Sequence, residues 1–218
     1  HRAYTGNECI SYGVHAAMSA TPSRRTQEER SSTTQQKLAE AAFNQIREKG
    51  YANFRVASVA KAAGVSQGGQ LHHFPTKDLM TMAAIEHAIS AAKLTTTQNL
   101  ERYTESQEII SAITTDCRDY YFSANFDVAM DVTKGASDNP ELRRQIARQH
   151  RIFRSYAEDG WHGILVDQGW STNDARDMIA MTASLVRGFA IRSMLKAGNK
   201  EIDRLMALWQ QMVHESFG

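Results

Sequence analysis

Cysteine and proline are scarce in this chain, with two cysteines and three prolines among 218 residues. Cys9 and Cys117 are too few for a disulfide framework or a structural zinc site, which fits a reducing compartment. Because proline interrupts helices and is rare here, long helices with short connections are the simplest interpretation. The expected location is therefore the cytoplasm.

Long apolar runs are absent as well. No stretch approaches the roughly 20 apolar residues that a membrane-spanning helix needs, and the N-terminal segment lacks the continuous apolar core of a signal peptide. The first methionine is Met18, so residues 1–17 are interpreted as upstream translated or vector-derived sequence. Together with the polar run that follows, residues 1–33 are expected to form this leader and a flexible basic arm.

The sequence also lacks the motifs of common catalytic sites. It has no phosphate-binding glycine loop, no nucleophile-elbow motif and no His-Glu-x-x-His pair, and Cys117 has no basic partner in the nearby sequence. Asp116 and Asp119 share one face of a predicted helix, but two solvated carboxylates are the simpler interpretation. We therefore expect no enzymatic activity, no metal ion and no cofactor.

Residues that favour helices are abundant, and no segment shows the alternation of a half-buried strand. Capping residues, glycine stops and apolar spacings of three and four residues mark the helix ends. The predicted helices span about 34–49, 55–63, 66–74, 76–102, 105–124, 126–135, 140–167, 171–195 and 200–217. The predicted fold class is all-α, with a small three-helix head over 34–80 and a larger helical domain over 81–218.

The segment VSQGGQLHHF, from Val65 to Phe74, is an unusual helix because it holds two adjacent glycines, each costing about 1 kcal/mol relative to alanine. Ser66 is a suitable N-cap, Pro75 ends the segment, and Gly64 provides a tight turn from the preceding helix. Two short helices joined at a glycine match the spacing of a helix-turn-helix motif, whose second helix enters a major groove of DNA.

Charge is distributed unevenly along the chain. Residues 18–80 hold nine basic and five acidic side chains, whereas residues 81–218 hold 15 basic and 18 acidic ones. A basic N-terminal third is typical of a nucleic-acid-binding face, although an ordinary solvated surface explains the charge alone equally well. Arg24, Arg25 and Arg30 of the arm are expected to approach the duplex electrostatically.

Residues 36–80 resemble the DNA-binding domain of the TetR-type (tetracycline-repressor) transcriptional regulators. The similar features are Ala-Ala-Phe in the first helix, Lys-Gly-Tyr at 49–51, Ala-Gly-Val-Ser at 63–66, and His-His-Phe-Pro at 72–75 followed by Lys77. The resemblance implies a homodimer with a helix-turn-helix head on each subunit, and a C-terminal domain that dimerises and binds a small-molecule effector.

The chain departs from the family pattern in two places. Gly68-Gly69-Gln70-Leu71 stands where the family usually has Gly-Thr-Leu-Tyr, which removes the tyrosine commonly used against the DNA backbone. Arg55 stands where the family often has Ser or Thr near the start of the second helix.

Two glutamines are the expected base readers. Gln67 and Gln70 lie three residues apart on one helix face, and a glutamine amide can pair with adenine through two hydrogen bonds. For either residue, solvation or packing against the first helix is the alternative. The expected contacts to phosphate or DNA backbone are Arg55, Ser66, Gly68, Gly69, His72, His73 and Lys77. The alternatives are a capping role for Ser66 and plain surface charge for Arg55 and Lys77.

The C-terminal domain is expected to hold an effector pocket, because aromatic and methionine side chains line such pockets, although they fill cores more often. The pocket candidates are Tyr120, Phe122, Met130, Trp161 and His162. The last two predicted helices are apolar on more than one side, which favours a face buried against a second subunit over a central core position. The interface candidates are Met181, Leu185, Phe189, Leu205, Trp209 and Met212.

These features predict a ligand-responsive DNA-binding regulator, most simply a repressor that binds a pseudo-palindromic operator as a homodimer. Its expected partners are double-stranded DNA, an unidentified small-molecule effector and a second copy of the chain, with no membrane. The alternative is a helical small-molecule sensor whose head contacts protein rather than DNA.

Overall fold

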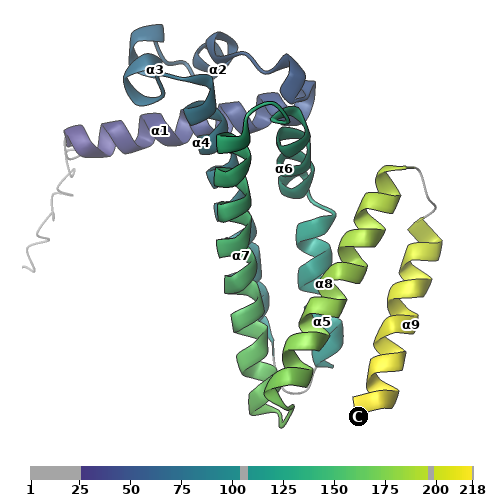
Figure 1. Ribbon diagram of the computed structural model, residues 1–218. Coiled ribbons are helices and arrows are strands. Elements are labelled where there is room, and N and C mark those ends of the chain that lie inside the picture. Colours follow the sequence, from purple (N-terminus) through teal and green to yellow (C-terminus); the bar gives the residue numbers. More distant parts are fainter. Residues whose placement is uncertain (1–25, 104–107, 196–198, 218) are drawn as a thin grey trace, which may run out of the picture.

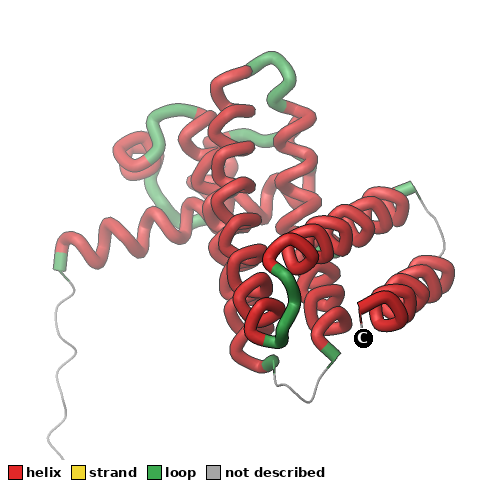
Figure 2. The backbone as a smooth tube through the Cα atoms, turned by 60° about the horizontal axis from the view of Figure 1, so that its bottom comes forward, coloured by secondary structure: helices red, strands yellow, loops and turns green. Residues whose placement is uncertain are grey.

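The computed structural model describes residues 26–103, 108–195 and 199–217. Within these ranges the chain forms nine α-helices and one short 3₁₀ helix, and no strand. Figure 2 shows helices joined by short loops. The prediction of an all-α fold is confirmed. The predictions made for the leader over 1–17, and for Arg24 and Arg25, lie outside the described residues.

An N-terminal head and a larger C-terminal bundle make up the fold (Figure 1). The head consists of α1 (Gln27–Lys49), η1 (Tyr51–Asn53), α2 (Val56–Ala62) and α3 (Gln67–His73). The bundle consists of α4 (Lys77–Arg102), α5 (Ile109–Tyr121), α6 (Ala124–Gly135), α7 (Pro140–Asp167), α8 (Thr172–Met194) and α9 (Asn199–Phe217). The helix α1 lies across one end of the bundle, with α2 and α3 on its far side.

The helix α1 begins at Gln27, about two turns before the predicted start near residue 34. Thr26 and Glu29 form a capping box, in which the Thr26 side chain accepts from the Glu29 backbone N–H and the Glu29 carboxylate accepts from the Thr26 N–H. Such a reciprocal cap satisfies two free backbone donors. It starts a helix in a polar stretch that has no apolar period, and Arg30 therefore lies on a helix instead of in a flexible arm.

Other helix ends agree closely with the sequence prediction because their capping residues act as expected. Thr76 accepts from the Leu79 N–H at the start of α4, and Ser171 accepts from the Asp174 N–H at the start of α8. Asn139 caps α7, whose first residue is Pro140. Proline suits this position because its missing N–H would have no partner inside the helix.

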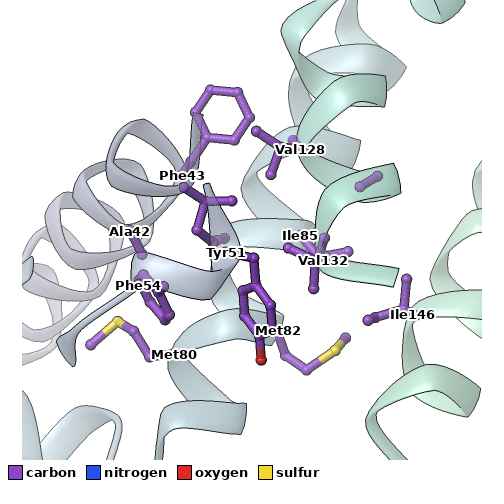
Figure 3. Close-up of a cluster of buried hydrophobic side chains, with 14 of the residues drawn as sticks. Ala42, Phe43, Tyr51, Phe54, Met80, Met82, Ile85, Val128, Val132 and Ile146 are labelled. Carbon is purple, nitrogen blue, oxygen red and sulfur yellow. The ribbon is translucent and has the colours of Figure 1, made fainter. Parts of the chain in front are cut away.

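One apolar core is shared by the head and the adjoining end of the bundle. It takes Leu38 from α1, Phe54 from the loop after η1, Met80 from α4 and Val132 from α6, all fully buried. Figure 3 shows side chains of these elements gathered in one cluster. Each such side chain contributes about 1.5–3 kcal/mol by leaving water. The head is therefore packed on α4 and α6 and has no separate core of its own.

Candidate nucleic-acid interface and ligand cavity

The helix α3 is held by its cap and by the turn before it. The Ser66 hydroxyl accepts from the Gly69 backbone N–H at 3.1 Å, which confirms the predicted N-cap. Gly64 has a φ of +66°, a left-handed conformation that glycine adopts without strain, and the Val65 N–H returns to the Ala60 carbonyl at 3.0 Å. The turn thus orients α3 relative to α2 as the helix-turn-helix spacing predicted.

The two adjacent glycines of α3 have different surroundings. A Cβ on Gly69 would lie 3.1 Å from Cγ1 of Val65 and 3.3 Å from Oγ of Ser66, whereas a Cβ on Gly68 would meet nothing within 4 Å. Gly69 therefore lets the helix pack closely against its own turn. Gly68 leaves a bare, exposed stretch of backbone.

The structure overturns the expectation that Gln70 reads a base. Its side chain is only 2% exposed, and its amide Nε2 donates to the Phe74 carbonyl at the C-terminal end of α3. Gln67 and Gln70 are about 60° apart around the helix, and the boundary between its exposed and buried sides falls between them, so Gln70 faces the interior of the head. Gln70 stabilises the end of the helix, and its buried side chain is not presented to a base edge.

The outer face of α3 consists of Gln67, Gly68, Leu71 and His72, which are all exposed. Leu71 is 48% exposed, although it is a large apolar side chain on a seven-residue helix. Leu71 was not among the predicted DNA contacts. It stands where the family usually has a tyrosine that contacts the DNA backbone, and that position was the signal that it faces DNA. The half-buried His73 lies edge-on to His72, with ring centroids 5.1 Å apart.

Two basic side chains expected at phosphates make contacts within the head. Nη1 of Arg55 donates to the carbonyls of Ala52 and Phe54, both at 3.0 Å. Nζ of Lys77 lies 4.6 Å from the centre of the Tyr51 ring, a cation–π contact. Both residues remain exposed at the starts of α2 and α4, so their charge faces solvent beside the helix-turn-helix motif.

The head meets the bundle where α1 packs on α4 and where η1 packs on α6. The backbone N–H of Tyr51 donates to Oδ2 of Asp131 in α6 at 2.6 Å. A Cβ on Gly135 would fall 2.4 Å from the Tyr51 ring, so α6 ends directly against that ring. At the same end, Nδ2 of Asn139 donates to Oδ2 of Asp78 in α4 at 2.7 Å.

A cavity of about 740 Å³ lies inside the bundle, enclosed mainly by α5, α6, α7 and α8. Three of the five predicted pocket residues line it, namely Tyr120, Met130 and Trp161. Phe122 and His162 do not line it, which corrects the prediction. Phe122 caps the end of α5 beneath the guanidinium of Arg118, and Nε2 of His162 lies 3.3 Å from the carbonyl of Thr172 near the surface.

A buried polar group forms one wall of this cavity. Oδ2 of Asp116 accepts from Nε1 of Trp161 at 2.9 Å, and its Oδ1 accepts from Nδ2 of Asn99 at 2.8 Å. Burial raises the pKa of Asp116. The interpretation of Asp116 as a solvated carboxylate is wrong, because it is 5% exposed and orients the indole; Asp119 does remain at the surface, where it shares Asn99.

Tyr120 and His150 form a second polar pair in the cavity wall. The Tyr120 hydroxyl and Nδ1 of His150 are 3.1 Å apart. Burial raises the pKa of Tyr120 and lowers the pKa of His150, so burial favours the uncharged form of both. The pair offers hydrogen-bonding groups to the cavity without adding charge.

The predicted interface residues lie on α8 and α9. Met181 and Met212 are 54% and 53% exposed, which is unusual for methionine on a helix, while Leu185, Phe189, Leu205 and Trp209 are half-buried. Nε1 of Trp209 donates to Oγ1 of Thr182 at 3.1 Å, so part of this ring is held within its own chain. Further exposed apolar side chains of the same two helices and the turn after α8 are Ile191, Met194, Leu195 and Leu208.

The described part of the chain holds neither a metal-ligand cluster nor a membrane-spanning helix. None of its His, Cys, Asp and Glu side chains gather in groups of three that could hold a metal ion. None of its helices is both long enough and apolar enough to cross a membrane.

Comparisons with known proteins agree on one family. A family model described as "Bacterial regulatory proteins, tetR family" matches residues 38–84. The HTH-type transcriptional regulator CymR of Pseudomonas putida is 35% identical over 197 residues, which cover 90% of this chain and 97% of CymR.

Solved structures of low sequence identity share the fold. A transcriptional regulator from Rhodococcus sp. Rha1 is 22% identical, with a TM-score of 0.64 over 84% of this chain and 96% of its own. A TetR transcriptional regulator from Legionella pneumophila is 15% identical, with a TM-score of 0.62 over 87% of this chain and 98% of its own.

Proposed function

Because the chain belongs to the TetR family of bacterial transcriptional regulators, we propose that it is a ligand-responsive repressor that binds a pseudo-palindromic operator as a homodimer. The observation that carries the DNA-binding part is the exposed outer face of α3, which a cap and a glycine turn hold against the head. A helix presented in this way fits the major groove. Such a regulator acts where the DNA is, in the cytoplasm.

Base recognition is assigned to two side chains of that face. Gln67 has a free amide that can pair with adenine, and Leu71 is apolar and exposed, which suits a thymine methyl group. The bare backbone at Gly68 allows a phosphate to approach closely. Arg55, His72 and Lys77 supply contacts to phosphate that add affinity without sequence information.

Dimerisation is assigned to the apolar sides of α8 and α9. Contiguous exposed apolar side chains mark protein interfaces more often than isolated ones do. Here Met181 and Met212 carry the most exposed of the predicted apolar surface. A two-fold dimer would present two heads to half-sites one helical turn apart, which explains why the expected operator is pseudo-palindromic.

The ligand response is assigned to the cavity and to α6. Phe126 and Met130 of α6 line the cavity, and Asp131 of the same helix bonds the head. A ligand that binds better when α6 is displaced would favour misplaced heads, and would lower DNA affinity by its ratio of affinities for the two conformations. Repression in the absence of ligand follows from this coupling.

The test is binding of the full chain to its own upstream region and to a random-sequence duplex, measured by fluorescence anisotropy between about 50 and 200 mM salt. We expect a steep salt dependence for both duplexes and tighter binding to the upstream region. Light scattering in the same buffer should give a dimer.

The alternative is a sensor whose head contacts protein. Absent or salt-insensitive binding to both duplexes would favour that alternative, and a monomer at micromolar concentration would remove the two-headed arrangement.

A further inference from the structure

Most of the charged residues that line the cavity of the bundle are basic. Five arginines contribute to its lining, Arg143, Arg144, Arg151 and Arg154 from α7 and Arg187 from α8. Only two acidic residues line it, Asp116 and Glu158. The bundle as a whole carries slightly more acidic than basic residues, so the excess of guanidinium groups is specific to this cavity.

Both acidic groups already have partners. Glu158 accepts from Nε of Arg154 at 3.1 Å, and Asp116 accepts from Trp161 and Asn99. The negative charge of each carboxylate is therefore partly compensated by donors of this chain.

Three of the arginines have no such partner. Arg144 forms an ion pair with Glu141 outside the cavity. For Arg143, Arg151 and Arg187, no carboxylate lies within 4.0 Å in the part of the chain that the structure describes. Arg187 is the half-buried member of this group, whereas Arg143 and Arg151 are exposed at the opening. A guanidinium that is partly removed from water without a partner is a site for an anion.

Arg187, Arg154 and Tyr121 all line the cavity. Burial raises the pKa of the Tyr121 hydroxyl, and the positive charges of Arg187 and Arg154 oppose that rise. One arginine comes from α8 and the other from α7, which means that positive charge flanks the cavity from two sides.

The rest of the lining is apolar and aromatic. Phe126 and Phe153 are buried, and both rings contact Tyr120, with centroid separations of 5.8 and 4.6 Å. Ile113 and Ile146 complete this inner part. The volume of about 740 Å³ lies within the range of small-molecule sites in proteins, about 300–1,000 Å³.

Because arginines line one part of the cavity and apolar side chains line the other, we propose that the cavity binds an amphipathic organic anion, a flat ring or short chain that carries one carboxylate. Its apolar body lies among Phe126, Phe153 and Tyr120, and its carboxylate is received by Arg187, with Arg151 at the opening. The inference rests on the ligand response proposed above and names the chemistry of that ligand. A cation would meet like charge here, and a neutral molecule would leave the Arg187 guanidinium without a partner.

The test uses three matched pairs, each an acid and its uncharged amide: benzoate and benzamide, 2-naphthoate and 2-naphthamide, octanoate and octanamide. Binding to the full chain without DNA is measured by isothermal titration calorimetry. We expect at least one acid to bind about tenfold more tightly than its amide, the effect of one charge-assisted pair. Arg187→Gln should remove that preference, while circular dichroism shows an unchanged helix content.

The matched control is Arg148→Gln. Arg148 is an exposed arginine of α7 that does not line the cavity, so the same substitution there should leave the preference for the acid intact. The proposal is overturned if no acid binds better than its amide, or if the preference survives in the double variant Arg187→Gln, Arg151→Gln.

A DNA-release assay separates this proposal from the proposed function. If an acid binds in an Arg187-dependent manner but leaves DNA affinity unchanged, the ligand class stands and the ligand response fails. If a neutral or cationic compound releases DNA while no acid binds, the response stands and the ligand class is overturned.

Discussion

The backbone N–H of Tyr51 donates a 2.6 Å hydrogen bond to Oδ2 of Asp131, which ties the head of this regulator to α6 across 80 positions of sequence. The Tyr51 ring also lies against Gly135 at the end of that helix. Since other residues of α6 line the cavity, one helix contacts both the head and the cavity.

Asp131→Ala removes the acceptor of the Tyr51 N–H. We expect a loss of about 1–3 kcal/mol in the free energy of unfolding, because a buried donor loses its partner. Urea unfolding followed by circular dichroism measures this. Asp127→Ala is the control, since Asp127 is an exposed acidic residue of the same helix. Equal effects of the two substitutions would show that the contact contributes nothing.

Gln67→Ala and Gln70→Ala should separate recognition from stability. Gln67→Ala is expected to relax the preference at one adenine position by about 1–3 kcal/mol, with little effect on folding. Gln70→Ala should instead lower stability, because the Phe74 carbonyl loses its donor. Selection from a random DNA pool and urea unfolding measure the two effects. If Gln70→Ala changed the selected DNA sequence and Gln67→Ala did not, both assignments would be reversed.

The adjacent glycines provide a matched pair for substitution by alanine. Gly69→Ala introduces a methyl group 3.1 Å from Val65, so a destabilisation of about 1–3 kcal/mol is expected from overpacking. Gly68→Ala has open space and should stabilise the helix by up to about 1 kcal/mol. The same Gly68 variant should bind DNA more weakly, because the new methyl group stands between backbone and phosphate. Thermal unfolding and anisotropy titrations test the pair.

His150 should make stability depend on pH. Burial lowers its pKa below the ordinary value of 6.5, so the unfolded chain binds a proton more readily than the folded one. The contribution of neutral His150 is therefore fully present above pH 6.5 and is lost as pH falls through the lowered pKa. We expect wild type to lose stability relative to His150→Gln over that range. A constant difference between the two unfolding curves would contradict the assignment.

Met181→Glu should disrupt the proposed dimer. A charge buried in an apolar interface costs several kcal/mol, so a shift to monomer at micromolar concentration is expected. Arg176→Glu is the control, because Arg176 is also exposed on α8 but lies about 140° around the helix. Light scattering of both variants measures the effect, and a dimeric Met181→Glu protein would move the interface elsewhere.

Local signals predicted most of the fold. The helices α4 and α7 were predicted nearly to the residue, because Thr76 and the Asn139-Pro140 pair are strong start signals that act through neighbouring backbone groups. The start of α1 was missed because residues 27–33 are polar. Apolar spacing carries no information there, and only the Thr26 and Glu29 capping box marks the helix.

The environments of the candidate site residues depend on contacts within the fold, and the spacing of residues along the sequence does not reveal these contacts. The three-residue spacing from Gln67 predicts an exposed Gln70. The family pattern, however, has an apolar leucine at position 70, and that leucine was a signal for burial. The bond from Trp161 to Asp116 spans 45 positions, and Trp161 of α7 lies in the apolar cluster formed with residues of α5 and α8. No local sequence pattern predicts such a pairing, so the burial of the Asp116 carboxylate was not predicted.

The apolar core shared by the head and α6 limits how this protein can be engineered. A chimeric regulator that joins this head to the bundle of another regulator would separate Leu38 and Phe54 from Val132 and would expose apolar surface on both sides of the cut. Because Leu142 and Ile146 at the start of α7 belong to the same core, such a fusion should keep the chain through Ile146 together with the head.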